Sequence, residues 1–529
     1  MKLLRAALTA ASLSALSAAA FAATPQDALV VAKNIDDIVS LDPAQAYEFT
    51  SGEVVNNVYD RLVQYDATDV QKMVGGLAES WEVSEDGRTI TFKLRPRVTF
   101  QSGNPVRPED VVFSFLRVVK LNKAPAFTLT QLGWTPDNME QMVKPVGADR
   151  VSITVKADLS PDFVLNVMAS RTASVVDEKT VRRNEANGDL GNAWLNTNSA
   201  GTGPFSLRSY RPAEAVTLAA NANYFNGAPK IRSVVMRHVP EPATQRLMLE
   251  ARDVDIARNL SPEQVRGIGE GKGVKIGVYP QAAVHFLSLN QKTEVLRNPK
   301  VWEAARHLVD YEGMANSFLK GQMKVHQAFW PEGFPGAVTD TPYKLDVAKA
   351  KALLAEAGLA NGFTVTLDVI NSPPFNEIAQ SLQGTFAQAG IKLELVPGTG
   401  SQVITKYRAR THQAMLLYWG PDFMDPHSNA KAFSYNVDNS DGAYQSTTTW
   451  RNAWLPPEAV SRKTMAALAE RDPAKRIQMY QELQREVQKE SPIVIMFQAV
   501  SQVALRDNVD GYVNGATSDQ VYYRLVNKR

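Results

Sequence analysis

The chain has 529 residues, with six histidines and no cysteine. The lack of cysteine excludes disulfides, thiolate metal ligands, a cysteine nucleophile and the lipidated cysteine that tethers many exported bacterial proteins. A single hydrophobic core rarely exceeds about 250–300 residues, so this length predicts two or more lobes.

The first 23 residues predict export. Lys2 and Arg5 give a positive start, Ala6 to Ala20 form an apolar stretch, and Ala20-Phe21-Ala22 has the small-x-small pattern of a cleavage site. The stretch is too short, and too rich in hydroxyl side chains, for a membrane span of ~20 apolar residues. We expect residues 1–23 to be a cleaved signal peptide, and the mature protein to be soluble, periplasmic and without a lipid anchor.

The formal net charge of +2 comes from Lys2 and Arg5, since 55 basic and 55 acidic residues are left once the first 23 residues are removed. A charge-balanced surface gives no electrostatic case for binding nucleic acid or anionic lipid. We therefore expect no nucleic-acid partner.

The first half of the mature chain mixes strands and helices. Hydrophobic periodicity predicts a strand over 28–33, a helix over 53–62, a hairpin over 81–100, a helix over 107–120 and a strand over 151–155. Residues 198–205 (NSAGTGPF) contain glycines but lack the Gly-Lys-Ser/Thr ending of a phosphate loop and lead into a strand-like segment. We interpret them as a backbone turn.

The second half alternates helices and strands more regularly. The patterns predict a helix over 346–358, capped by Asp346 and ended by Gly358, then a strand over 363–370, a helix over 376–389 and strands over 391–396 and 414–419. Such alternation is typical of an α/β lobe with a largely parallel sheet. Ligands of these sheets bind beyond the carboxyl ends of the strands, where Asp422 falls.

Motifs for catalysis are missing. The sequence has no Gly-x-Ser-x-Gly elbow, and its histidines lack the spacing of a metal site, so we expect surface or locally satisfied histidines and no metal. Asp422 and Asp425 could in principle perform acid–base chemistry. Asp425-Pro426 is more typical of a turn start. Asp422 fits a turn or helix cap as well as a ligand site.

Seven phrases, in order, resemble the peptide-binding family of periplasmic solute-binding proteins, the receptors of peptide and nickel ABC importers. They are LDPAQ (41–45), VYDRLVQYD (58–66), LAESWEVSEDGRTITFKLRPRVTFQSGNPVRPEDVVFSF (77–115), GTGPFSLRSY (201–210), NANYFNGAPKI (221–231), NPKVWEAARHLVDYEGM (298–314) and YKLDVAKAKALLAEAGL (343–359). The resemblance spans essentially the whole mature chain.

The resemblance implies an α/β, two-lobed periplasmic-binding-protein (Venus-flytrap) fold of class C (cluster C), with an extra N-terminal subdomain. Hinges are expected near 279–290 and 491–500, which are extended apolar segments. The implied domains are lobe I (24–48, 190–280 and 495–529), an inserted subdomain (49–189) and lobe II (281–494).

The resemblance also implies a ligand site. In peptide receptors of the family, an Asp in a W-x-x-D-x-x-[DE]-P segment binds the ligand's α-amino group, and residues 419–426 (WGPDFMDP) look similar, with Asp422 at the Asp position. An amine would complete a carboxylate that lobe closure buries. The other residues expected to contact the ligand are Tyr418, Trp419, Phe423, Tyr47, Phe49, Thr50, Phe375 and Asn376.

One departure limits the ligand prediction. Dipeptide receptors hold the ligand's carboxylate with an Arg near the start of the helix that here reads PPFNEIAQSLQ (373–383), and this segment has none. In this respect the chain resembles the branch containing the D-alanyl-D-alanine receptor. Longer peptides, modified peptides and amine-bearing conjugates stay open.

The implied function is that of a monomeric binding protein, without enzyme activity or cofactor. It would deliver a peptide, possibly with D-amino acids or modifications, to an inner-membrane ABC permease heterodimer with ATPase subunits. Alternatives within the class are receptors for nickel chelates, heme, glutathione, opines or siderophores. A secreted hydrolase is disfavoured because it needs a nucleophile–base pair, for which the sequence has no motif. A role as a periplasmic chaperone or as a chemoreceptor partner stays open, because fold alone does not decide function.

Overall fold

The computed structural model describes residues 24–529 apart from 70–71, 157, 269–272, 444, 446, 516 and 518. The predicted signal peptide lies outside the described residues. Within them, no helix combines the length and the apolar character that crossing a membrane requires.

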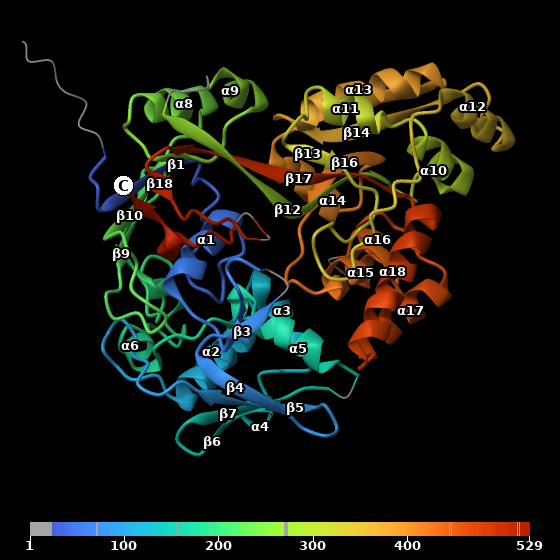
Figure 1. Ribbon diagram of the computed structural model, residues 1–529. Helices are drawn as coiled ribbons and strands as arrows, with labels where there is room; N and C mark the ends of the chain where they lie inside the picture. The colour runs from blue at the N-terminus through green and yellow to red at the C-terminus, as the bar shows by residue number, and fades with distance from the viewer. Residues whose placement is uncertain are drawn as a thin grey trace, which may run out of the picture.

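One large mixed sheet runs through both halves of the molecule (Figure 1). Its middle strands, β12 and β17, belong to both halves, and the short β13 also pairs with β17. The strands in spatial order are β15 (Ile391–Gly398), β14 (Phe363–Ile370), β16 (Ala414–Trp419), β12 (Val274–Leu289), β17 (Ile493–Arg506), β11 (Ile256–Ala257), β1 (Ala28–Lys33), β10 (Ser233–His238), β9 (Ala215–Ala220) and β8 (Phe205–Arg211), with β13 at Met323–Val325.

The long strands β12 and β17 connect the two halves. They pair antiparallel along their lengths, with a register shift between Pro280 and Val284, opposite Val500 and Gln498, and a second, smaller one between His285 and Phe286. On one side of the first shift β17 also pairs with β11, and on the other side β12 pairs with β16. Both predicted hinge segments fall in these strands. The domain boundaries given above stay a prediction.

Lobe II is built on β14, β15 and β16, which are parallel to one another, while β16 pairs antiparallel with β12. The prediction of a largely parallel sheet is therefore correct only for this edge, because β12 and β17 cross between the lobes in opposite directions. The helices of this half are α10 (Pro299–Arg306), α11 (Tyr311–Asn316), α12 (Val347–Glu356), α13 (Phe375–Gln388), α14 (Gly400–Arg408), α15 (Pro426–Ser434), α16 (Thr448–Arg451), α17 (Glu458–Ala469) and α18 (Pro473–Glu490).

The predicted subdomain contains a separate four-stranded antiparallel sheet, drawn at the bottom of Figure 1. Its core also takes in Phe423 and Leu468, which come from the other half of the chain, so the subdomain packs against lobe II. Its elements are β4 (Ala78–Val83), β5 (Thr89–Leu94), β6 (Val143–Val146), β7 (Arg150–Thr154), α2 (Pro108–Leu121), α3 (Phe127–Thr130), α4 (Met139–Met142) and α5 (Pro161–Met168), beside a small β2 (Val63–Tyr65)–β3 (Met73–Gly75) pair.

The remaining elements include α1 and α6, which fall within the predicted subdomain range (49–189) but pack in the same core as β1, β8, β9 and β10. The first helix, α1, spans Phe49–Val58, whereas the sequence predicted 53–62. It ends early because the Val58 carbonyl accepts a hydrogen bond from the backbone of Gly203 (2.9 Å) and Tyr59 turns extended. The others are α6 (Glu178–Arg183), α7 (Asn192–Leu195), α8 (Pro242–Glu250), α9 (Pro262–Gly267), β18 (Val509–Asp510) and β19 (Asn527–Lys528).

The turn at 198–205 needs its glycines because it lies directly against α1. A Cβ on Gly201 would sit 2.1 Å from the Val58 carbonyl oxygen, and one on Gly203 would sit 2.5 Å from the Val58 carbonyl carbon. The interpretation of this segment as a backbone turn is confirmed, since no helix follows it and β8 begins at Phe205.

We expect Gly201→Ala to lower the free energy of unfolding by about 1–3 kcal/mol, because backbone atoms cannot move aside for the methyl group. Gly384→Ala is the matched control. Gly384 lies in α13 with open space around its Cβ position, so alanine there should add about 0.5–1 kcal/mol. Urea unfolding of both variants measures the two changes. Equal stability of Gly201→Ala and the unmodified chain would contradict the close approach.

Candidate functional site

Asp422 lies in the loop that follows β16, at the carboxyl end of the parallel strands. Its Oδ1 accepts a 2.8 Å hydrogen bond from the Tyr47 hydroxyl, and its backbone N–H donates to Ser428 Oγ at 2.9 Å. Tyr47 precedes α1, while Asp422 and Ser428 belong to the other half of the chain. The Tyr47–Asp422 bond therefore joins the two sides of the molecule.

Burial dominates the electrostatics of this carboxyl. It raises the pKa of Asp422 above its ordinary value, while the Tyr47 hydrogen bond and the charges of Arg171 and Arg451 act in the opposite direction. Burial, together with the neighbouring Asp422, also raises the pKa of Tyr47, which stays a hydroxyl donor. An ionised Asp422 is thus destabilised by its burial and would gain from a cationic partner.

Arg171 supports this arrangement from the predicted subdomain. Its Nη1 bonds Asp519 Oδ2 and its Nη2 donates to the Tyr47 carbonyl, both at 2.7 Å. Arg171 is therefore already occupied, and it positions Tyr47 toward Asp422. A cavity of about 30 Å³ between Arg171, Asp519 and Asp422 has room for little more than one or two waters.

A larger cavity of about 300 Å³, here called the interlobe pocket, lies beside Gly420. Its walls come from α1, β12, the start of α13, β16 and β17, so both sides of the molecule contribute. The side chains are mostly apolar. The lining residues are Phe49, Gln281, Ala282, Ala283, His285, Phe375, Tyr418, Gly420, Ala499 and Thr517.

Aromatic rings form one wall of the interlobe pocket. His285 lies 5.6 Å from Phe375 and 5.7 Å from Tyr418, measured between ring centroids, and the two latter rings are 5.9 Å apart. Burial lowers the pKa of His285 to about 4, so its ring is neutral near pH 7. Phe49 and Tyr418 remain 37% and 38% exposed, so both rings are accessible from the pocket. The wall suits an uncharged apolar side chain.

The predicted site residues separate into three groups. Phe49, Phe375 and Tyr418 line the interlobe pocket, and Tyr47 bonds Asp422. Trp419 packs on Phe433, and Phe423 touches the small cavity but is mostly buried against Phe163 of the subdomain. Thr50 is buried in α1 and Asn376 bonds Asn371, and neither lines the two cavities.

Asp425 has a structural role, as its turn-start interpretation predicted. It caps α15 by accepting from the His427 backbone at 2.9 Å. It is also fully buried and pairs with both terminal nitrogens of Arg476 at 2.7 and 2.8 Å, a contact that the sequence did not indicate. Asn166 of the subdomain donates to it at 3.0 Å. Asp425 is thus unavailable to a ligand.

The histidines are more buried than expected, since His285, His307, His326, His412 and His427 are all at most 7% exposed. The expectation of local partners holds for five of the six. They are His238, His307, His326, His412 and His427, which bond Ile35, Lys344, Trp330, Asn452 and Tyr480. Across the described ranges, no three His, Asp or Glu side chains are grouped as metal ligands would be.

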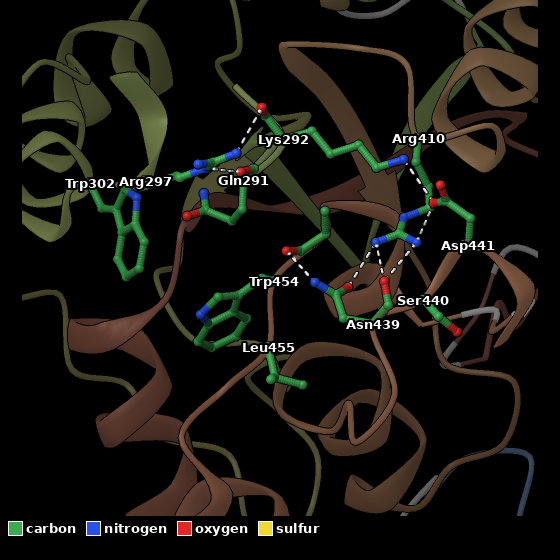
Figure 2. A pocket seen from close by; sticks show the side chains of 11 residues that line it. Gln291, Lys292, Arg297, Trp302, Arg410, Asn439, Ser440, Asp441, Trp454 and Leu455 are labelled. Atoms are coloured by element: carbon green, nitrogen blue, oxygen red, sulfur yellow. Dashed lines mark hydrogen bonds and ion pairs between the residues drawn. The ribbon is translucent and has the colours of Figure 1, made fainter. Parts of the chain in front are cut away.

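A third hollow, of about 630 Å³, lies elsewhere in the molecule. Figure 2 shows Lys292 and Arg410 converging on Asp441, with Trp302 and Trp454 on the opposite side. Arg410 also bonds Asn439, and Arg297 donates to backbone carbonyls. The cations are therefore engaged within the protein. Unlike the interlobe pocket, this hollow is not lined by α1 or by residues 281–285 of β12.

Sequence reasoning missed four side chains near Asp422 and the interlobe pocket: Arg171, Gln281, His285 and Arg451. Gln281 and His285 were visible as polar residues within an otherwise apolar hinge segment, which is a usable signal. Arg171 and Arg451 lie far from residue 422 in sequence, and nothing local marks them.

Two lobes joined by two crossing strands, with a buried carboxyl and an apolar pocket between them, define a clamp-like solute receptor. The chain belongs to the bacterial extracellular solute-binding proteins, family 5, whose middle-region model matches residues 72–441. This is a family of binding proteins and not of enzymes. Both the predicted family and the predicted fold class are confirmed.

Relatives cover nearly the full chain. It is 29% identical over 513 residues to the probable D,D-dipeptide-binding periplasmic protein DdpA of Escherichia coli K12, covering 95% of this chain and 94% of the relative. It is 26% identical over 501 residues to the dipeptide-binding protein of the same organism, covering 88% and 89%.

Solved structures share the fold. DppA from Helicobacter pylori in complex with the peptide STSA has a TM-score of 0.80 at 23% identity, covering 95% of this chain and 98% of that one. MoaA from A. tumefaciens R10 in complex with mannopinic acid has a TM-score of 0.79 at 23% identity, covering 96% and 100%.

Proposed function

We propose that the protein is the periplasmic binding component of an ABC importer, which captures short peptides or peptide-like solutes and delivers them to a permease heterodimer with ATPase subunits. The observation that carries the proposal is the buried carboxyl of Asp422 next to the apolar interlobe pocket. An α-amino group of the ligand would neutralise the Asp422 carboxylate, and a ligand side chain would fill the interlobe pocket. The names of the relatives DdpA and dipeptide-binding protein support this substrate class.

Ligand binding would stabilise the closed arrangement of the lobes. Asp422 comes from one side and Tyr47 from the other, and the interlobe pocket also has walls from both. A ligand that touches both sides binds the closed form better than the open form, which shifts the equilibrium between them. This role needs no chemical reaction. Cleavage of residues 1–23 would release the mature protein into the periplasm.

A second candidate ligand class is an opine-like conjugate, in which an amine and a carboxylate lie close together. The cations Arg451 and Lys431, which act on the Asp422 carboxyl, suit such a compound, whereas Arg171 is already paired with Asp519. The structurally similar MoaA was solved with mannopinic acid.

A thermal-shift screen tests the proposal. Di-, tri- and tetrapeptides, peptides of D-amino acids, an opine and a nickel chelate are added to the mature protein at equal concentrations. We expect peptides with a free amine to raise Tm, because binding to the folded state at 100 times Kd adds about 2.7 kcal/mol. N-acetylated peptides are the control and should have little effect. If no peptide raises Tm while the opine or the chelate does, the peptide proposal is wrong.

A further inference from the structure

Gln281 and His285 are the buried polar side chains in the wall of the interlobe pocket, and both come from the crossing strand β12. They are 5% and 7% exposed. The Gln281 amide oxygen Oε1 and the His285 ring nitrogen Nδ1 are closed to water and have no hydrogen-bond partner among the described residues. Buried polar atoms of native proteins are nearly always hydrogen-bonded, so two such atoms in the wall of one cavity call for an explanation.

Gln498, in the neighbouring strand β17, shows how a buried glutamine is satisfied in this fold. Its Nε2 donates to the carbonyls of Gln281 and Glu332, both at 3.0 Å, and its Oε1 accepts from the Glu332 backbone N–H at 2.9 Å. The Gln281 amide uses only its nitrogen, which donates to the Tyr279 and Pro280 carbonyls at 3.4 and 3.2 Å. Because these two carbonyls require a donor, they fix the orientation of the amide and leave Oε1 as an acceptor without a donor.

His285 is the exception among the histidines. The other five each bond a protein group, whereas no residue within the described ranges forms a hydrogen bond with the His285 ring. Burial keeps this ring neutral near pH 7, so it offers one acceptor nitrogen and one donor nitrogen but no charge. A ligand side chain without polar atoms would fill the cavity and still leave this ring and Gln281 Oε1 unsatisfied.

The shape of the interlobe pocket favours a flat ring. Its wall contains the rings of His285, Phe375 and Tyr418, and the Tyr418 ring is inclined by only 27° to that of His285. A cavity of ~150 Å³ binds benzene, and this pocket, at about 300 Å³, has room for a second ring. Tyr418 is partly exposed, and its hydroxyl makes no hydrogen bond to the described part of the chain, so a ligand ring can push it aside and reach the His285 ring on which it stacks.

We infer that the interlobe pocket selects a ligand side chain whose aromatic ring carries a neutral N–H or O–H donor, as an indole or a phenol does, and that Gln281 and His285 determine this preference. The inference rests on the proposed function and names the chemical class of the side chain. Gln281 Oε1 is already removed from water in the folded protein, so a ligand donor gains a hydrogen bond without desolvating this acceptor. A ring that lacks the donor leaves the acceptor unpaired, and this difference discriminates between the two ligands.

Calorimetry with two pairs of dipeptides tests the inference. One pair joins alanine to tryptophan or 1-methyltryptophan, the other joins alanine to tyrosine or phenylalanine, and each ring is placed first and second in the dipeptide. The members of a pair differ mainly in the donor, and in at least one pair we expect the donor-bearing member to bind about 10-fold more tightly. Gln281→Met should lose most of this preference, and the double variant Gln281→Met/His285→Phe should lose all of it. Gln478→Met, on the exposed face of α18, is the matched control and should keep it.

Equal affinities within both pairs, or a preference that the double variant keeps, would overturn the inference. A further readout needs no ligand. Gln281→Met should melt no lower than the unmodified chain, because the fold makes no use of Oε1, whereas Gln498→Met should melt lower because it leaves backbone groups of Gln281 and Glu332 unpaired. A fall in the Tm of Gln281→Met as large as that of Gln498→Met would also overturn the inference. If no dipeptide binds the unmodified protein, the proposed function fails, and the ligand-free melting comparison still decides whether Gln281 serves the fold.

Discussion

Replacing Asp422 by asparagine is expected to weaken the binding of short peptides by at least about 30-fold. The change removes the anionic partner of the ligand amine while keeping the shape of the side chain. Loss of one member of a buried charge pair typically costs about 2–5 kcal/mol of binding energy, because the other charge is left desolvated. Isothermal calorimetry with a dipeptide that stabilises the unmodified protein measures the effect.

The same variant separates a binding role from a folding role. Burial raises the pKa of Asp422, so ionisation costs stability as the pH rises through its folded-state pKa. Asparagine carries no charge, and ligand-free Asp422→Asn should therefore be as stable at pH 7 as the unmodified protein, or more so. If affinity were unchanged and stability fell, Asp422 would be a turn-forming residue only.

Breaking the Arg476–Asp425 pair is expected to have the largest effect on stability. Both side chains are almost fully buried and bonded through two nitrogens, so Arg476→Met leaves a desolvated carboxylate without its cation. Such a loss typically costs about 3–5 kcal/mol. Urea unfolding measures it, and Arg462→Met is the control because Arg462 and its partner Glu458 are exposed and should contribute less than about 1 kcal/mol.

The pair also gives a pH dependence with a definite sign. Burial alone would raise the pKa of Asp425, but Arg476 outweighs it and holds the pKa below its ordinary value. The stabilisation is therefore complete above the unfolded-state pKa near 4 and is lost as the pH falls through the lower folded-state value. The difference in stability between the unmodified chain and Arg476→Met should shrink in acid. A difference that stayed constant down to pH 2 would contradict this account.

Local patterns in the sequence were sufficient for most of lobe II. The strands predicted at 363–370 and 414–419 coincide with β14 and β16, and Asp346 caps α12 as expected. These elements are regular because each has a buried face and short-range caps, which sequence spacing reveals. The end of α1 was predicted wrongly because a glycine turn from residues 201–203 stops it, and such a contact leaves no trace in the helix's own periodicity.

The site was only partly predictable. Asp422 could be assigned because a local motif surrounds it, and the aromatic residues near it are visible as such. Arg451 and Arg171 could not be assigned, since their importance depends on which charges they meet after folding. Asn376 was chosen from its position near the expected carboxylate contact, but its side chain bonds Asn371 at 3.2 Å instead. Charge balance between distant segments is a property of the fold and not of any one segment.

The register shift between β12 and β17 has a mechanical consequence for the receptor. Gln281, Ala282 and Ala283 fall within the shift and also form part of the interlobe pocket, and Gln498 fixes them by donating to the Gln281 carbonyl at 3.0 Å. The ligand's side chain would therefore rest on the pivot itself. An oversized side chain would press on the hinge strands and prevent full closure of the lobes. Such a compound could bind and still leave the receptor in a conformation that the importer does not accept.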